Sequence, residues 1–204
     1  ASYWDAAVNS APRDRTVKAD RIFDKNRVDA ILEGLKNVST GEARETRKAS
    51  TQKAPLLFDL TSLQRESNRR FSFSAKRTLD AAQRLYEGHK LITYPRTDSR
   101  HLPDDYLEPV MNVLEVMSGD LEYGPIVELV QKDGPLNLNV LLNSEKISDH
   151  FAIIPTANEA TSVLTGDDAK VYDLIVRQFL AALMPPAIWN QVERFVALEV
   201  NGET

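Results

Sequence analysis

The longest apolar pattern in the sequence repeats with the period of an α-helix. It starts after Thr165, runs to Leu183 and stops at two consecutive prolines, Pro185 and Pro186, which end helices. A helix of this length with an apolar face must pack that face against other elements. The pattern therefore predicts a helical core. The residues expected to point inward are Val171, Leu174, Ile175, Phe179, Leu180 and Leu183.

Shorter helical segments precede this one. Polar residues that can cap a helix N-terminus stand before most of them. The stretch 39–54 is polar throughout and is typical of a loop or hinge. The expected helices are one capped by Asp24 with Val28, Ile31, Leu32 and Leu35 on one face, one from Thr61 or Ser62 to Arg70, one capped by Ser74 over about 75–88, one opened by Pro103 and one over 125–132.

The two ends of the chain have strand patterns instead. Residues 2–8 are strand-like, and residues 194–200 alternate apolar and polar side chains as a half-buried strand does. Asn201 and Gly202 then form a hairpin signal without a returning strand, so we expect a piece of a longer polypeptide. The expected fold is α+β, with a partial β arch from two segments of one sheet, 1–58 and 185–204, and a helical domain, 59–184, inserted between them.

Composition and charge limit the chemistry. The 204 residues include no cysteine, which excludes disulfides and thiolate metal sites, and the three histidines are scattered. No run of about 18 apolar residues predicts a membrane span. Residues 1–100 carry 20 basic and 13 acidic side chains, whereas residues 101–204 carry 5 and 17. A phosphate-binding surface is therefore expected in the first half, although uneven charge on solvated faces explains the same numbers.

A tyrosine and an arginine flank a proline at residues 94–96. The proline restricts the backbone, so Tyr94 and Arg96 are expected to project from a rigid turn. A tyrosine hydroxyl can attack a phosphodiester, and an arginine can bind the non-bridging oxygens on which charge develops. On these residues alone, a core tyrosine with its hydroxyl at the surface is the more common explanation.

Four segments, in order and spacing, resemble the type IA DNA topoisomerases. Residues 89–100 (HKLITYPRTDSR) are similar to the active-site signature of that family. Their sequence most resembles the signature of its bacterial topoisomerase III branch. The resemblance covers about residues 59–184 well and the flanks more loosely. The accompanying segments are 59–68 (DLTSLQRESN), 74–87 (SAKRTLDAAQRLYE) and 148–156 (SDHFAIIPT).

The resemblance implies that Tyr94 is the nucleophile, that Arg96 binds phosphate and that His150 is a third catalytic residue. It implies a winged-helix-like domain that cleaves and rejoins one DNA strand through a 5′-phosphotyrosine, which allows relaxation or decatenation by strand passage. The family usually has His or Glu where this chain has Phe151, and His150 on its own can be a structural histidine.

Residues close to the signature are the candidates for DNA contact. Asp98 is expected to orient Arg96 or a hydroxyl, because like charges keep it from phosphate. Lys76 and Arg77 are expected to belong to a solvated helix face. The candidate DNA-binding residues are Gln83, Thr93, Thr97, Asp98, Ser99 and Arg100.

The acidic Mg²⁺ site of the family lies N-terminal to these motifs. The adjacent acidic pairs at 104–105 and 167–168 are typical of charges at helix starts. We therefore expect no metal site in this chain, Mg²⁺ bound elsewhere in the parent protein and no activity of the chain alone. The expected partners are single-stranded DNA and the remaining domains of the same polypeptide, in a monomer at the bacterial nucleoid in the cytoplasm, with no membrane. A non-catalytic single-stranded-DNA-binding module and another tyrosine-nucleophile strand transferase remain alternatives.

Overall fold

A computed structural model of the chain describes residues 24–38, 40–132, 137–158 and 163–199. The chain divides into two compact units, one formed by Ala1–Ser50 with Trp189–Thr204 and the other by Thr51–Ile188. The strand expected at residues 2–8 and the turn expected at Asn201 and Gly202 lie outside the described residues.

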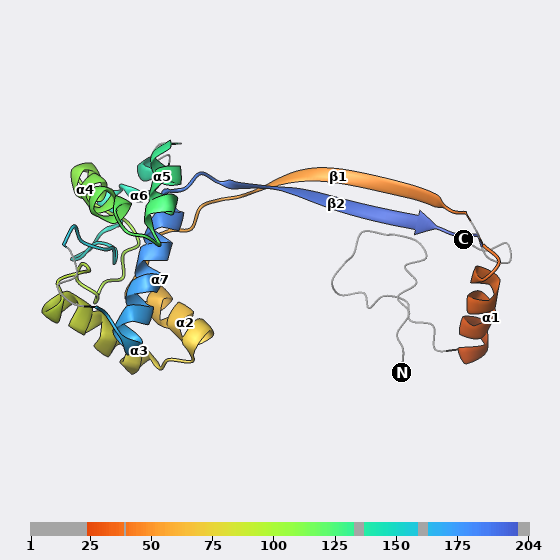
Figure 1. The fold of residues 1–204 in the computed structure, drawn as a ribbon, viewed down its shortest axis with the longest axis horizontal. Coiled ribbons are helices and arrows are strands. Elements are labelled where there is room, and N and C mark those ends of the chain that lie inside the picture. Colours follow the sequence, from red (N-terminus) through yellow and green to blue (C-terminus); the bar gives the residue numbers. More distant parts are fainter. Residues whose placement is uncertain (1–23, 39, 133–136, 159–162, 200–204) are drawn as a thin grey trace. The chain divides into compact units, whose positions relative to one another are not determined.

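The first unit contains a helix and most of two long strands. The helix α1 (Lys25–Leu35) begins where the Asp24 carboxylate accepts hydrogen bonds from the amides of Asn26 and Arg27. The predicted cap is therefore confirmed, although no residue of α1 is buried. The strands β1 (Glu42–Gln52) and β2 (Ala187–Ala197) form a two-stranded sheet in which they run antiparallel (Figure 1).

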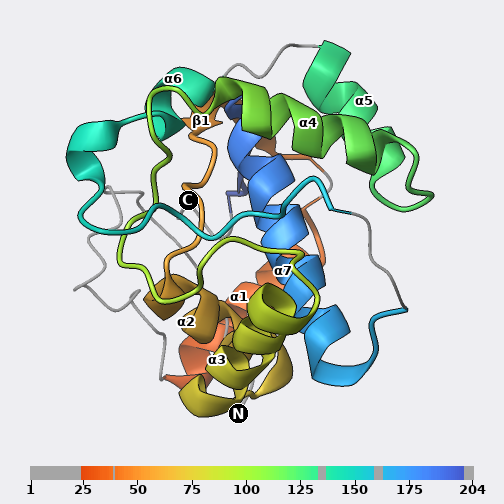
Figure 2. The ribbon, with the colours of Figure 1, turned by 90° about the vertical axis from the view of Figure 1, so that its left-hand side faces the viewer.

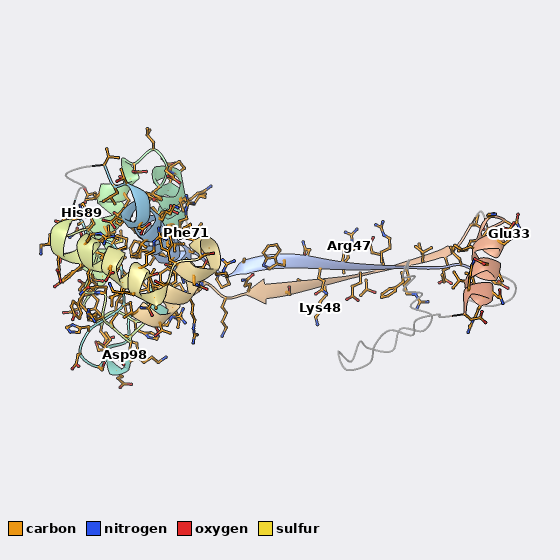
Figure 3. The ribbon with its side chains drawn as sticks, turned by 90° about the horizontal axis from the view of Figure 1, so that it is seen from below. Glu33, Arg47, Lys48, Phe71, His89 and Asp98 are labelled. Atoms are coloured by element: carbon orange, nitrogen blue, oxygen red, sulfur yellow. The ribbon has the colours of Figure 1, made fainter. Side chains whose placement is uncertain are left out.

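The strand β1 occupies the stretch 39–54 that was expected to be a loop or hinge, so that prediction was wrong. All of its residues are exposed, and Figure 3 shows Arg47 and Lys48 projecting to opposite sides. Neither face of the strand is buried, and its sequence therefore lacks the apolar alternation that identifies strands. Pairing with β2 and charged cross-strand contacts support it instead, such as Arg194 donating to Glu45 at 2.6 Å.

The strand predicted near the C-terminal end is present as β2, but it is not half-buried. All of its residues are exposed, including the large apolar side chains Ile188, Val192 and Phe195. The alternation over residues 194–200 therefore indicated only the last part of the strand, which spans Ala187–Ala197, and it indicated the burial incorrectly.

The second unit contains the helices α2 to α7. All of them except α6, which was not predicted, lie close to predicted positions, although α4 begins at Leu107 and not at Pro103. Asp59, rather than Thr61 or Ser62, caps the first of them, in a reciprocal capping box with Ser62. Ser74 caps α3 as predicted, but that helix passes into a π turn, η1 (Arg84–Gly88), instead of continuing to residue 88. The helices are α2 (Leu60–Phe71), α3 (Ala75–Gln83), α4 (Leu107–Ser118), α5 (Gly124–Lys132), α6 (Leu138–Leu141) and α7 (Gly166–Leu183), with a 3₁₀ turn η2 (Ser144–Lys146).

The helix α7 runs through the centre of the second unit (Figure 2). Its six predicted inward residues are all buried, which confirms the helical core. Val171, Leu174 and Ile175 pack in a cluster with residues of α2 and α3, and Phe179 and Leu180 pack in a second cluster with α4, α5 and α6. Within the part of the chain that the structure describes, no helix is both long and apolar enough to cross a bilayer.

Extended segments complete the second unit without forming a regular sheet. Three isolated bridges join them, Phe58 to Ile153, Ile92 to Pro155 and Leu102 to Leu142. Phe58, Ile92, Leu102 and Ile153 are buried in the clusters around α7. These bridges fix the segment that carries Tyr94 against the helical core.

Candidate active site

Two motif segments that are distant in sequence are paired at the site. The amide of Thr93 donates to the carbonyl of Ile154 at 3.0 Å, and the amide of Ile154 donates to the Thr93 hydroxyl at 3.0 Å. The same hydroxyl donates to the carbonyl of Ala152 at 2.9 Å, and Thr156 donates to the carbonyl of Leu91 at 2.9 Å. This ladder holds the backbone that leads into Tyr94, and Thr93 acts in it as a structural residue.

Tyr94 lies half-buried between two other rings. Its ring centroid is 4.3 Å from that of His150, with an interplanar angle of 49°, and 5.4 Å from that of Tyr86, with an angle of 77°. The structure therefore brings together two of the predicted catalytic residues, Tyr94 and His150. Among the described residues, the Tyr94 hydroxyl has no hydrogen-bond partner, and the orientation of the ring depends on packing.

Arg96 is exposed beside the same rings. Its guanidinium makes no hydrogen bond or ion pair with any residue that the structure describes. It lines an open cleft of about 260 Å³ together with Thr97, Asp98, Ser148, Asp149 and His150. An unpaired guanidinium in a cleft that also contains His150 is available to bind an anion, and its fork of donors suits the oxygens of a phosphate.

Besides Thr93, three of the candidate DNA-binding side chains donate to backbone carbonyls of the protein itself. The Thr97 hydroxyl donates to the carbonyl of His150 at 2.7 Å. The buried Ser99 hydroxyl donates to the carbonyl of Lys146 at 3.0 Å, and the Arg100 guanidinium donates to the carbonyl of Leu57 at 2.8 Å. These contacts fasten the loop after Tyr94 to its surroundings. Direct DNA contact by these side chains stays a prediction.

The other candidates occupy different positions. Asp98 is exposed at the edge of the helical unit (Figure 3) and accepts a hydrogen bond from the Ser148 hydroxyl at 3.0 Å. Gln83 is the half-buried last residue of α3, directly before the π turn. The Gln83 side chain makes no hydrogen bond with a described residue. Its DNA-binding role therefore also stays a prediction.

The basic side chains on α3 and at the start of η1 are neutralised by carboxylates. Arg77 donates two hydrogen bonds to Asp167, at 2.6 and 2.7 Å, and Arg84 pairs with Asp168 at 2.6 Å. The hydrogen bonds that Arg77 donates lower the pKa of the Asp167 carboxyl, and the hydrogen bonds that Arg84 donates to Asp168 raise the pKa of Arg84. Because these charges are paired within the protein, Arg96 is the more accessible cation beside Tyr94.

The sequence as a whole matches a known family profile. The profile is described as DNA topoisomerase, and the match extends over residues 1–204. The chain belongs to the type IA DNA topoisomerase family.

Curated topoisomerases of known organisms are similar along most of this chain. DNA topoisomerase 3 of Bacillus subtilis (strain 168) is 41% identical over 195 residues, which cover 94% of this chain and 26% of the relative. DNA topoisomerase 3 of Shouchella clausii (strain KSM-K16) is 42% identical over 177 residues, which cover 85% and 24%. The chain therefore spans about a quarter of the length of these curated relatives.

A solved topoisomerase has a similar fold. Full-length topoisomerase I from Thermotoga maritima matches with a TM-score of 0.56 and 22% sequence identity, over 91% of this chain and 32% of that chain. At this identity the likeness concerns the fold alone. Together with the helices and the two-stranded sheet, it confirms the expected α+β class.

The topoisomerase motif around His150 departs from the family pattern at Phe151. The Phe151 ring lies 4.7 Å from the ring of Tyr106, at an interplanar angle of 51°, and both rings pack against the core cluster of α4. At this position the chain therefore has an apolar packing contact between the motif segment and the residue before α4.

The described residues do not fit the Mg²⁺ site that the family implies. In the described ranges, no group of three or more His, Asp or Glu side chains is placed to hold a metal ion. Asp167 and Asp168 are held by arginines, and Asp104 accepts a hydrogen bond from the amide of Ser144 at 3.2 Å.

Sequence reasoning did not identify two further residues close to this site. The ring of Tyr86 contacts the ring of Tyr94. The Lys90 ammonium lies 5.6 Å from the centroid of the Tyr86 ring. The π turn that brings Tyr86 to this position has no signal in the sequence.

Proposed function

We propose that this chain supplies the nucleophile and a phosphate-binding cation of an enzyme that cleaves and rejoins DNA. The Tyr94 hydroxyl oxygen attacks the phosphorus of a backbone phosphodiester and loses its proton. A bond forms to the 5′-phosphate of the downstream segment, and the bond to the upstream 3′-oxygen breaks, leaving a 3′-hydroxyl after protonation. Another strand passes through the gap, and the reverse reaction reseals it without ATP. The packing of Tyr94 against His150, beside an unpaired Arg96, is the observation that carries this proposal.

Arg96 and His150 have different proposed roles. Arg96 binds the non-bridging oxygens of the scissile phosphate, because two of its donors can reach two oxygens while charge develops there. His150 lies against the Tyr94 ring with its side chain exposed, so it both positions the ring and contacts the phosphate. Its imidazole can donate one hydrogen bond in the neutral form and two when protonated.

The proposed substrate is single-stranded DNA that follows the loop after Tyr94. Exposed Asp98 and half-buried Gln83 flank this path, with Asp98 orienting its neighbours. The loop residues Thr93, Thr97, Ser99 and Arg100 shape the path by holding its backbone, and they contact the strand where their remaining donors reach it.

The remaining parts of the reaction are proposed to come from the rest of the full-length protein. Mg²⁺ and the donor that protonates the 3′-oxygen are supplied there, since the residues that the structure describes here do not fit a metal site. Residues 59–184 form a winged-helix-like domain, supported by the packing of α2, α3 and α7, and residues 1–58 with 185–204 form part of a β arch. The protein acts as a monomer at the bacterial nucleoid in the cytoplasm.

The experiment is covalent trapping with the full-length protein. A single-stranded oligonucleotide labelled at its 3′ end is incubated with protein and Mg²⁺, and the reaction is stopped with denaturant. We expect the label to migrate with the protein, because a 5′-phosphotyrosine retains the downstream segment. Tyr94→Phe should form no adduct yet bind the oligonucleotide. Tyr172→Phe, which removes a hydroxyl from a core tyrosine, is the matched control and should form the adduct.

The same experiment separates the alternatives. Binding without any adduct would indicate a non-catalytic single-stranded-DNA-binding module. An adduct that retains a 5′-end label instead would indicate a different tyrosine strand transferase. An adduct formed by Tyr94→Phe would show that another residue is the nucleophile.

A further inference from the structure

Two uncommon backbone features precede Tyr94 closely in the sequence. The first is the π turn η1 (Arg84–Gly88), which contains Tyr86. The second is Lys90, whose φ of 59° lies in the left-handed region that residues other than glycine rarely adopt. Both kinds of feature are unfavourable and are found preferentially at functional sites. Tyr86 in the π turn and Lys90 are only four residues apart. This proximity indicates that the segment has a functional role in addition to connecting α3 with Tyr94.

The second motif segment holds Lys90 in its strained conformation. The Lys90 carbonyl accepts a hydrogen bond from the Thr156 hydroxyl at 2.6 Å and another from the Asn158 side-chain amide (Nδ2) at 2.8 Å. The next residue, Leu91, donates from its amide to the carbonyl of Leu85 at 2.9 Å. A strained residue persists only where its surroundings fix it in several ways, as they do here.

These features place the Tyr86 ring against Tyr94 and a cation against the Tyr86 ring. The Lys90 ammonium lies 5.6 Å from the Tyr86 ring centroid, within the range of a cation–π interaction. The Tyr86 ring meets the Tyr94 ring in an edge-to-face arrangement at 5.4 Å. Since the Tyr94 hydroxyl has no partner among the described residues, Tyr86 and His150 determine the direction in which the ring points.

We propose that Tyr86 is a positioning residue for Tyr94, and that Lys90 holds Tyr86 in place. This inference rests on the proposed role of Tyr94 as nucleophile. An attacking oxygen must be aligned with the phosphorus, and a small misplacement of a nucleophile lowers the rate strongly without weakening substrate binding. Tyr86 acts through its ring, so its own hydroxyl is dispensable. Lys90 acts through its charge, so arginine can replace it.

The test measures single-turnover cleavage and binding of single-stranded DNA by the full-length protein. We expect Tyr86→Leu to lower the cleavage rate about 10-fold or more with the Kd changed less than about twofold, whereas Tyr86→Phe cleaves at close to the wild-type rate. Phe71→Leu is the matched control, because Phe71 is a half-buried aromatic residue packed on the same cluster. It should leave the cleavage rate unchanged.

Substitutions of exposed Lys90 provide a second test, and they do not alter the core. Asparagine tolerates the left-handed conformation, so Lys90→Asn removes the charge while keeping the backbone. We expect it to slow cleavage about 3-fold or more, with Lys90→Arg restoring the rate. Wild-type cleavage by both Tyr86→Leu and Lys90→Asn would overturn the proposal, as would equal losses of binding and cleavage. If Tyr94→Phe also formed the adduct, the assignment of the nucleophile would fail instead.

Discussion

The hydroxyl of Thr97 donates a hydrogen bond of 2.7 Å to the backbone carbonyl of His150, 53 residues further along the chain. The same oxygen accepts a hydrogen bond from the amide of Ser99 at 3.0 Å. One buried side chain thus ties the loop that follows Tyr94 to the segment that presents His150. The distance between the two proposed catalytic rings depends on this connection.

Removing the Thr97 hydroxyl should loosen the site. We expect Thr97→Val, which keeps the shape of the side chain, to lower the free energy of unfolding by about 1 kcal/mol and to slow cleavage about 10-fold in the full-length protein. Thr97→Ser should retain most of both. Thr78→Val removes a hydroxyl that donates to the carbonyl of Ser74 within α3 and serves as the control. Thr78→Val should lower the stability without slowing cleavage. Denaturant titration and single-turnover cleavage measure the two effects.

Arg96 should act on phosphate and not on folding. We expect Arg96→Ala to lower the cleavage rate by about 10²-fold, the effect of losing one transition-state donor. Arg96→Lys should recover only part of that rate, because a point charge replaces a fork of donors. The melting temperature of both variants should equal that of the wild type, since the side chain is exposed and unpaired among the described residues. A drop of many degrees for Arg96→Ala would show a structural residue.

Releasing Arg84 from its carboxylate should strengthen DNA binding. In Asp168→Asn the guanidinium of Arg84 becomes free at the start of η1. We expect a higher affinity for single-stranded DNA. The slope of log Kd against log salt concentration should increase by about one, the change that one additional phosphate contact produces. Asp173→Asn is the control, because Asp173 pairs with Arg177 elsewhere on the same helix. Equal salt-dependence slopes for Asp168→Asn and the wild type would show that Arg84 does not contact the bound strand.

His101 should make stability depend on pH. Burial, with smaller effects of Lys146 and Arg100, lowers the pKa of His101 below its ordinary value of 6.5. As pH falls through 6.5, the unfolded chain gains a proton that the folded chain does not bind. The stabilising effect of neutral His101 is complete above that pH and is lost below it, by at most about 1.4 kcal/mol per pH unit. Denaturant titrations of the 204-residue chain between about pH 7.5 and 5.5 should show this slope, and His101→Gln should reduce it.

The 204-residue chain by itself should fold but not relax supercoiled DNA. It contains the proposed nucleophile and Arg96, whereas its described residues offer no group that could hold a metal ion. Gel analysis of a negatively supercoiled plasmid with Mg²⁺ tests this. Relaxation by the chain, lost in Tyr94→Phe, would contradict it.

The helical part of the fold was predictable because burial leaves a periodic signal. The apolar period after Thr165 gave α7 and its buried residues, and Ser74 marked the start of α3. The strand β1 was not predictable in the same way, because both of its faces are exposed and its pairing partner lies more than a hundred residues away. The π turn was missed because its sequence continues the helical period of α3.

The site was predictable from motifs but not from side-chain directions. Nearness in sequence to Tyr94 suggested DNA contact for Thr97, Ser99 and Arg100, but it did not indicate that each of them also donates to a backbone carbonyl of the protein. Only tertiary structure shows which donors are already used. The same limit hid the contact between Tyr86 and Tyr94, which depends on the local geometry of η1.

The ribbon formed by β1 and β2 contributes little to the heat of unfolding, because it buries none of its side chains. The heat-capacity change of unfolding follows the apolar surface that becomes exposed, and among the described residues that surface belongs almost entirely to the helical unit. A calorimetric trace of the chain therefore reports the melting of the helices, while backbone amides of the ribbon exchange with solvent early. An unchanged melting curve consequently says nothing about whether a substitution in β1 or β2 has disrupted the ribbon.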